Sequence, residues 1–254
     1  MNFNINTLRV LTFNIHKGIS FYSRRQILDK IKIFIRKTHA DLVFLQEIRC
    51  PGLLGLEGVH EADVFNSQFE YLADSVWGHF AYGKNAIYQN GNHGNAILSR
   101  YPIQSWDNID ISTNTFEKRG LLHVTVIHPK LGILNLICLH LNLLARGRKY
   151  QINRLIELIS KRIIISPLIV AGDFNDWTQK VSEQIHEPIN LKEAFYTING
   201  SYASSYPRVL PVLCMDRVYY RGLDPISVQV LRGNQWSSLS DHAALIVDFI
   251  VPKS

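Results

Sequence analysis

The sequence predicts an α/β fold in which two mixed β-sheets pack face to face and helices cover the outer faces. Short apolar strand segments outnumber long helical segments, and the first 45 residues show the order strand, helix, strand. Residues 78–140 then form a series of short strands with short connections. A strand–helix–strand unit gives parallel neighbours and short connections give antiparallel ones, so mixed sheets are expected. A barrel or a doubly wound sheet fits this order less well.

The chain opens with an expected strand at Leu8–Phe13. Apolar residues at i, i+4, i+7 and i+8 from Ile27 then predict a helix that begins at Ser23. The next strand is expected at Leu42–Leu45, because this segment is apolar and too short for a helix. These three elements form the strand–helix–strand unit at the start of the fold.

Later segments follow the same two periodicities. A loop at 51–58 and a short helix at Ala62–Tyr71 precede the strand series. An amphipathic helix is expected at Gln151–Ile165, and one or two short helices at Val181–Ala194. The further expected strands are 78–83, 94–98, 103–111, 121–128, 133–140, 168–171, 215–220, 226–231 and 243–251.

Composition and length indicate one domain, spanning residues 1–254. Of the 254 residues 46% are hydrophobic, which is enough for a sizeable core. Two smaller domains would need a Pro/Gly/Ser-rich linker or a change of composition, and the sequence contains neither. Polar residues at strand ends run from position 14 to position 242, so a shared site would require a single fold. We expect the protein to be a monomer.

The charge and cysteine content bound the partners and the compartment. A net charge of +6 favours polyanionic partners such as nucleic acid or phospholipid headgroups, although many basic proteins bind neither. Three widely spaced cysteines indicate a reducing compartment rather than a disulfide framework. No signal peptide is visible at the N-terminus, and no apolar run is long enough to span a bilayer. We therefore expect a cytoplasmic location, with non-standard export left open.

Polar side chains end several apolar strand segments. These residues are Asn14, Glu47, His140, Asp173 and the pair Asp241–His242. A carboxylate or an imidazole at the tip of a buried strand contributes little to packing. We therefore expect the strand ends to converge on one polar site. Carboxylate, amide and imidazole groups without cysteine suit a hard divalent cation and a phosphate.

Each of these motifs also has a purely structural explanation. Gly172–Asn175 could form an Asx turn or a helix N-cap, and Asn14 could be a turn residue. Glu47 could end its strand in solvent, and His140 could be a hydrogen-bonded core histidine. The convergence of several such residues is what favours function over structure.

Basic residues cluster at two further positions. Arg146, Arg148 and Lys149 stand ahead of the expected helix at 151, where positive charge opposes the helix macrodipole. Arg146 is therefore a candidate phosphate ligand, and a solvated basic loop is the alternative. Arg119, between Lys118 and a glycine, offers a second guanidinium for a phosphate.

Taken together, these motifs resemble those of the endonuclease/exonuclease/phosphatase superfamily of metal-dependent phosphoesterases. The matching stretches follow the family's order along nearly the whole chain and are Thr12–Asn14, Leu45–Glu47, Gly94–Ile103, Gly172–Asn175 and Ser240–His242. The ordered set is far more specific than any one motif. The resemblance implies a four-layer α/β sandwich with the site at one end of the two sheets.

The resemblance also implies a Mg²⁺ site, for which Mn²⁺ is the alternative ion. Glu47 would be the principal ligand, with Asn14 and Asp241 near the same ion. Asp173 would orient or deprotonate the attacking water, and Asn175 would hold the water or the phosphate. The number of ions stays open.

The remaining implied roles concern the phosphate. His242, oriented by Asp216, would contact the phosphoryl oxygens, and His140 would protonate the leaving oxygen. Arg119 and Asn142 would bind the phosphate. Which histidine is the acid stays open.

The resulting hypothesis is a divalent-metal-dependent phosphoesterase that hydrolyses a phosphodiester by in-line attack of water. Nucleic acid and phospholipid headgroups are competing substrates, and a phosphomonoesterase is an alternative. A second class is a catalytically silent module that binds a phosphorylated partner. Aromatic residues that could stack on bases or insert at a membrane are Tyr22, Trp77, Trp106, Trp177 and Trp236.

Overall fold

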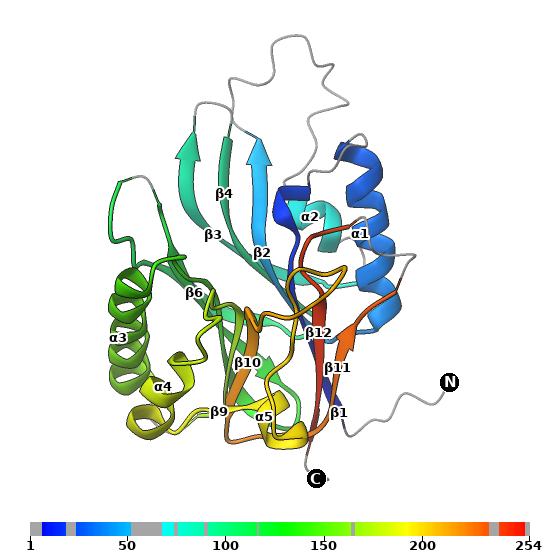
Figure 1. The fold of residues 1–254 in the computed structure, drawn as a ribbon. Coiled ribbons are helices and arrows are strands. Elements are labelled where there is room, and N and C mark those ends of the chain that lie inside the picture. Colours follow the sequence, from blue (N-terminus) through cyan, green and yellow to red (C-terminus); the bar gives the residue numbers. More distant parts are fainter. Residues whose placement is uncertain are drawn as a thin grey trace.

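The computed structural model describes residues 7–18, 24–51, 68–73, 76–88, 91–115, 117–163, 166–233 and 239–251. Within them, twelve strands form two six-stranded sheets that pack face to face (Figure 1). Helices α1 (Arg24–Thr38) and α2 (Gln68–Ala73) cover one outer face, and α3 (Ala145–Arg162) and α4 (Val181–Ile189) cover the other (Figure 1). This is the expected α/β sandwich with two mixed sheets.

The first sheet has the strand order β11-β12-β1-β2-β4-β3. The parallel pair β1 and β2 comes from the opening strand–helix–strand unit, and the other neighbours are antiparallel. The bounds are β1 Thr7–Asn14, β2 Leu42–Pro51, β3 His79–Tyr88, β4 Gly91–Ser99, β11 Asp224–Leu231 and β12 Ala244–Ile250.

The second sheet has the strand order β5-β6-β7-β8-β10-β9. Its parallel pair is β7 and β8, which α3 connects, and its other neighbours are antiparallel. The bounds are β5 Ile103–Asp110, β6 Gly120–His128, β7 Gly132–His140, β8 Leu168–Asp173, β9 Lys192–Glu193 and β10 Asp216–Arg221.

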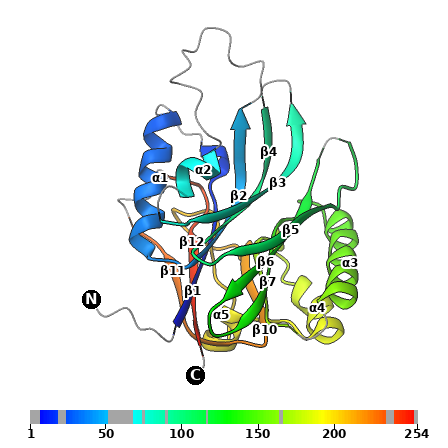
Figure 2. The same cartoon turned by 180° about the vertical axis from the view of Figure 1, so that it is seen from behind.

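Three apolar layers hold the sandwich together. The central layer lies between the sheets and includes Phe44, Leu136 and Phe249, all fully buried. A second layer joins α1 to the first sheet, and Ile31 and Ile35 of α1 are completely buried there. Burial of each such side chain stabilises the fold by about 1.5–3 kcal/mol. The third layer packs α3 and α4 on the second sheet (Figure 2).

The structure corrects several expected boundaries. Helix α3 begins at Ala145 rather than 151, so the basic residues lie inside its first turn and not in a preceding loop. The buried Arg148 side chain donates to the carbonyl oxygens of Asn142 and Leu143, which explains why this charge is tolerated near the helix start. The expected helix at 62–71 is seen as α2 from Gln68, and its earlier part lies outside the described residues.

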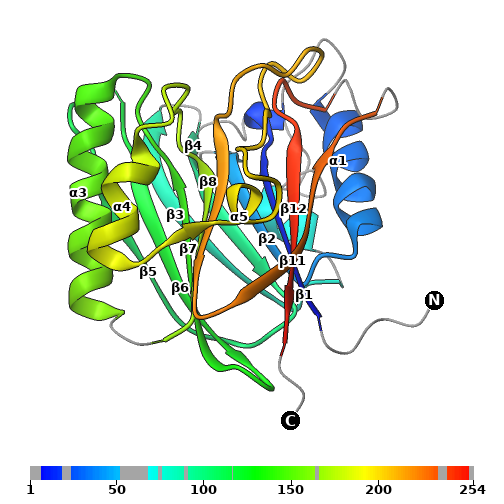
Figure 3. The ribbon, with the colours of Figure 1, turned by 60° about the horizontal axis from the view of Figure 1, so that its bottom comes forward.

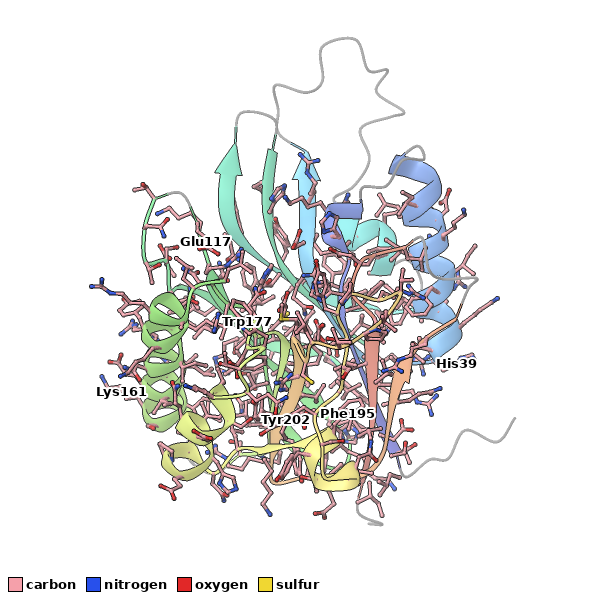
Figure 4. The ribbon with its side chains drawn as sticks, viewed as in Figure 1. His39, Glu117, Lys161, Trp177, Phe195 and Tyr202 are labelled. Carbon is pink, nitrogen blue, oxygen red and sulfur yellow. The ribbon has the colours of Figure 1, made fainter. Side chains whose placement is uncertain are left out.

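Two further features bear on function. Trp77 is only 2% exposed and donates to the Ala40 carbonyl, so it is a core residue rather than a ligand platform. A short α5 (Ala194–Asn199) lies beside β10 and β11, where Phe195 enters the central layer (Figure 4). Among the described helices, none is both long and apolar enough to cross a bilayer.

Candidate active site

Strand ends from both sheets meet at one edge of the sandwich. In the second sheet, His140 of β7 pairs with Asp173 of β8, and Asp216 of β10 pairs with the same residue. In the first sheet, β1 ends at Asn14, and His242 lies just before β12. Figure 3 shows the neighbouring strands β1 and β12. These five residues are all buried, so their polar groups depend on hydrogen bonds within the protein.

Asp173 is the centre of this cluster. Its Oδ2 accepts a 3.0 Å hydrogen bond from the Asn14 amide and lies 3.5 Å from His140 Nε2 and 3.8 Å from His242 Nε2. Its Oδ1 accepts the backbone N–H of Asn175 at 2.9 Å. One carboxylate is thus held by groups from several strand ends, which fixes its orientation.

The Gly172–Asn175 turn explains how Asp173 reaches this position. Gly172 has φ +148°, and a Cβ at this residue would lie 2.0 Å from the Leu139 carbonyl oxygen. Only glycine therefore permits the close approach of β8 to β7 at the strand end. The Asx turn considered above is present, with Asn175 at φ +50° and its amide donating to the Leu141 carbonyl. The turn and the polar cluster are compatible, since the turn places the carboxylate.

His242 is held by a second carboxylate. Its Nδ1 lies 2.8 Å from Asp216 Oδ2, which also accepts from the Ser205 hydroxyl at 2.5 Å. Burial opposes a charge on this imidazole, but Asp216 and Asp173 outweigh that effect and raise the pKa of His242 to about 10. The ring is therefore a cation at neutral pH and offsets part of the charge of the two carboxylates.

His140 has the opposite character. Burial is the main cause that lowers the pKa of this imidazole to about 3; the nearby Arg119 acts in the same direction, and Asp173 opposes it. The two histidines around one carboxylate thus differ in charge at neutral pH. A neutral ring can accept or donate a hydrogen bond, whereas the charged ring can only donate.

Glu47 is directed into the site by an irregularity in β2. The pairing of β2 with β4 shifts between Leu45 and Ile48, and Glu47 adopts φ +59°. A bulge of this kind changes the direction of a side chain, and a positive φ at a non-glycine residue is typical of functional positions. Glu47 Oε1 accepts from the Asn14 amide at 3.3 Å.

A cleft of about 220 Å³ opens beside Glu47 and His140. Its lining combines basic, acidic, amide and imidazole groups: Lys17, Glu47, Asn85, His93, Gly94, Asn95, Glu117, Lys118, Arg119 and His140. Lys17 and Arg119 make it suitable for an anion. Asn95 donates from the buried strand β4 to the Gly120 carbonyl. Lys17, Asn95 and Ser205 were not predicted as site residues, although an asparagine within an apolar strand, in the Gly94–Ile103 stretch, was a usable signal.

Comparisons with known proteins show the family of this chain. The sequence pattern of the Endonuclease/Exonuclease/phosphatase family matches residues 11–242. The chain belongs to this family. Uncharacterized protein YbhP of Escherichia coli is 39% identical over 244 residues, which cover 94% of each chain.

Solved structures with this fold are more distant in sequence. An endonuclease/exonuclease/phosphatase from Beutenbergia cavernae has a TM-score of 0.78 at 22% identity, covering 97% of this chain and 72% of its own. D. rerio TDP2 complexed with single strand DNA product has a TM-score of 0.71 at 17% identity, covering 96% and 98% of the two chains. At these identities the likeness shows the fold alone. Members of the family are hydrolases that act on phosphoester bonds.

A divalent cation, which the family generally uses, would find oxygen donors here. Glu47, Asn14 and Asp173 offer hard ligands at one point, although the Asn14 amide presents its nitrogen to both carboxylates. Asp173, Asp216 and His242 also lie within 4.8 Å of one another, and one Asp216 oxygen is buried without a hydrogen-bond partner. In that second group the charged imidazole offsets one of the two carboxylate charges and repels a cation, so the Glu47 group suits a cation better.

The other predicted residues are placed as follows. Asp241 is partly exposed and lies 3.3 Å from His16 Nδ1; its contacts among the described residues do not include Glu47. Arg119 lines the cleft and pairs with Glu117 at 2.9 Å. Asn142 and Arg146 line a neighbouring cavity of about 560 Å³ instead, and the Asn142 side chain is bonded to Thr113 and Gln151.

Proposed function

We propose that this protein hydrolyses a phosphodiester by in-line attack of water in the cleft beside Asp173, with a divalent cation, Mg²⁺ or Mn²⁺, as cofactor. The observation that carries the proposal is the Asp173 carboxylate, which lies against His140, His242 and Asn14 from strand ends of both sheets. A buried carboxylate between two imidazoles is well suited to orient and deprotonate a water.

We assign a different role to each side chain around the phosphate. His242 carries a proton toward Asp216 and points Nε2 to the Asp173 side, so it would donate to a phosphoryl oxygen. Asn175 fixes Asp173 through its backbone N–H. Arg119 and Lys17 in the cleft would balance the charge of the phosphate. His140, which lines the cleft with Arg119, would protonate the leaving oxygen.

The cation would be held by Glu47 and Asn14, with Asp241 near the same ion. When bound, it would neutralise developing charge on the phosphate and lower the pKa of a coordinated water. The hard oxygen donors at this point support the assignment. TDP2, whose structure was solved with a single strand DNA product, supports a phosphodiester as the substrate class.

The test is hydrolysis of bis-p-nitrophenyl phosphate with Mg²⁺ or Mn²⁺, with EDTA, and by Glu47→Gln and Asp173→Asn. We expect EDTA and each substitution to lower kcat/KM by at least about a hundredfold. Asp224→Asn is the matched control, because this exposed carboxylate begins β11 at the opposite end of the sheet. Equal rates in all arms would remove the catalytic proposal.

A further inference from the structure

The most exposed apolar side chains of the described residues lie on loops that surround the site. Among the described residues, the four most exposed large apolar side chains are Val209 (90%), Leu144 (74%), Leu210 (72%) and Val212 (64%). Single exposed apolar residues are common on soluble proteins, but a group of them at a site marks an interaction surface. Leu143 and Trp177, also exposed, belong to the same region.

The strand topology places these loops at one edge. Leu143 and Leu144 follow the end of β7, and Trp177 follows the end of the parallel strand β8. The 209–212 loop precedes β10, which runs antiparallel to β8, so it leaves the same edge (Figure 3). These six residues, Leu143, Leu144, Trp177, Val209, Leu210 and Val212, are called the apolar rim.

The 209–212 loop, the most exposed part of the apolar rim, is anchored by hydrogen bonds of the residues that flank it. Tyr206 and Leu213 form a β-bridge below the tip, and the Arg208 N–H donates to the Asp241 carbonyl at 2.7 Å. The Tyr206 ring packs on His242 at 4.9 Å between centroids. The fold therefore holds an apolar loop tip in solvent directly beside the site, so a binding surface on it would be preorganised.

Cationic side chains accompany the apolar rim. Arg146 and Lys149 are exposed in the first turn of α3, and Lys180 is exposed after Trp177. The Arg148 guanidinium lies 4.7 Å from the centre of the Trp177 ring. Apolar tips flanked by basic residues match the surface of an anionic bilayer, where aliphatic groups and tryptophan enter the interface and cations meet the headgroups.

The second cavity lies beside the Leu144 part of this surface. It lies between the Ser112–Asn114 loop and the start of α3, and Leu144 and Arg146 are part of its wall. Glu117 lines both this cavity and the catalytic cleft, so the two are neighbours; Figure 4 shows Glu117 and Trp177 on the α3 side of the sandwich. A polar headgroup bound in this cavity would lie next to the cleft while its lipid stays at the rim.

We infer that the apolar rim seats the protein on an anionic phospholipid surface, and that its substrate is a phosphodiester of a membrane-lipid headgroup. The inference rests on the proposed function and names its substrate class. Nucleic acid would use the basic groups but would gain little from Val209, Leu210 and Leu144, because aliphatic side chains neither pair with phosphates nor stack on bases. The positions of the apolar residues therefore favour lipid.

The test is co-sedimentation with vesicles of equal parts phosphatidylglycerol and phosphatidylcholine. The rim variant is Leu143→Ser/Val209→Ser/Leu210→Ser, and the matched control is Ile127→Ser/Ile133→Ser/Ile250→Ser, three exposed apolar residues at the opposite end of the sheets. We expect the rim variant to bind vesicles at least about tenfold more weakly and the control to bind like the unmodified protein. Thermal unfolding checks that both are folded.

The outcomes separate the two proposals. Equal vesicle binding by all three proteins, or equal losses in rim variant and control, would overturn the docking surface. A rim variant that instead loses affinity for single-stranded DNA would assign the surface to nucleic acid and overturn the lipid substrate. The protein could also bind vesicles through the apolar rim and yet be inactive on bis-p-nitrophenyl phosphate. That result would overturn the proposed function and the substrate class, but it would leave the docking surface in place.

Discussion

Asn14 and Asp173 are joined by a 3.0 Å hydrogen bond, although they lie 159 positions apart and belong to different sheets. The same amide donates to Glu47 at 3.3 Å. One side chain thus connects the proposed cation ligand to the proposed water-orienting carboxylate across the sandwich. The position of each carboxylate depends on how the two sheets pack.

Replacement of Asn14 tests this connection. Asn14→Ala removes the donor shared by the two carboxylates, so we expect kcat/KM on a soluble phosphodiester to fall by about a hundredfold or more. Asn135→Ala is the control, since this buried amide lies near the start of β7, away from the site. A fall in activity of equal size in the control would indicate a general loss of folding instead.

Asp216 and Ser205 are expected to act through His242. Asp216→Asn removes the charge that holds the imidazole at 2.8 Å, and Ser205→Ala removes only the hydroxyl that orients Asp216. We therefore expect kcat to fall by about a hundredfold for Asp216→Asn and by about tenfold for Ser205→Ala. A larger effect for Ser205→Ala than for Asp216→Asn in steady-state kinetics would contradict this order.

Gly172 is required by the backbone. Gly172→Ala places a Cβ 2.0 Å from the Leu139 carbonyl oxygen at φ +148°, and we expect a loss of about 3 kcal/mol or more in the free energy of unfolding. Gly78→Ala is the matched control, because nothing lies within 4 Å of its added Cβ. Urea denaturation of both variants measures the two losses of stability, and similar unfolding midpoints would refute the steric argument.

Glu193 makes stability depend on pH. Burial raises the pKa of this carboxyl from 4.5 to about 7, against the opposing effect of the Tyr196 N–H bond. Its contribution to stability is therefore fully present below pH 4.5 and is lost as the pH rises through 7, a change of about 3 kcal/mol.

Glu193→Gln removes this titration. We expect the decrease in the free energy of unfolding between pH 4.5 and pH 8 to be about 3 kcal/mol smaller in Glu193→Gln than in the unmodified protein. The comparison uses urea denaturation at both pH values. The same decrease in both proteins would show that Glu193 ionises normally in the fold.

Local sequence patterns predicted many elements of the fold. The 3.6-residue spacing from Ile27 predicted α1, and the apolar run before Gly172 predicted β8. The start of α3 was misplaced because its first turn is polar, and the buried contacts of Arg148 with backbone carbonyls could not be inferred from periodicity. Trp77 was misjudged for a related reason, since exposure depends on the neighbours that pack on a residue.

The sequence by itself determined which residues stand at strand ends, because turn chemistry and apolar runs are local properties of the chain. It also determined the family, through the order of short motifs along residues 11–242. Only the tertiary structure decided that His140 is neutral and His242 is charged, because the two pKa values depend on burial and on which carboxylates face each ring. The tertiary structure also decided that the loops after β7 and β8 and the loop before β10 expose apolar side chains at the same edge of the sheet. Strand pairing is the reason, because it sets which loops share an edge.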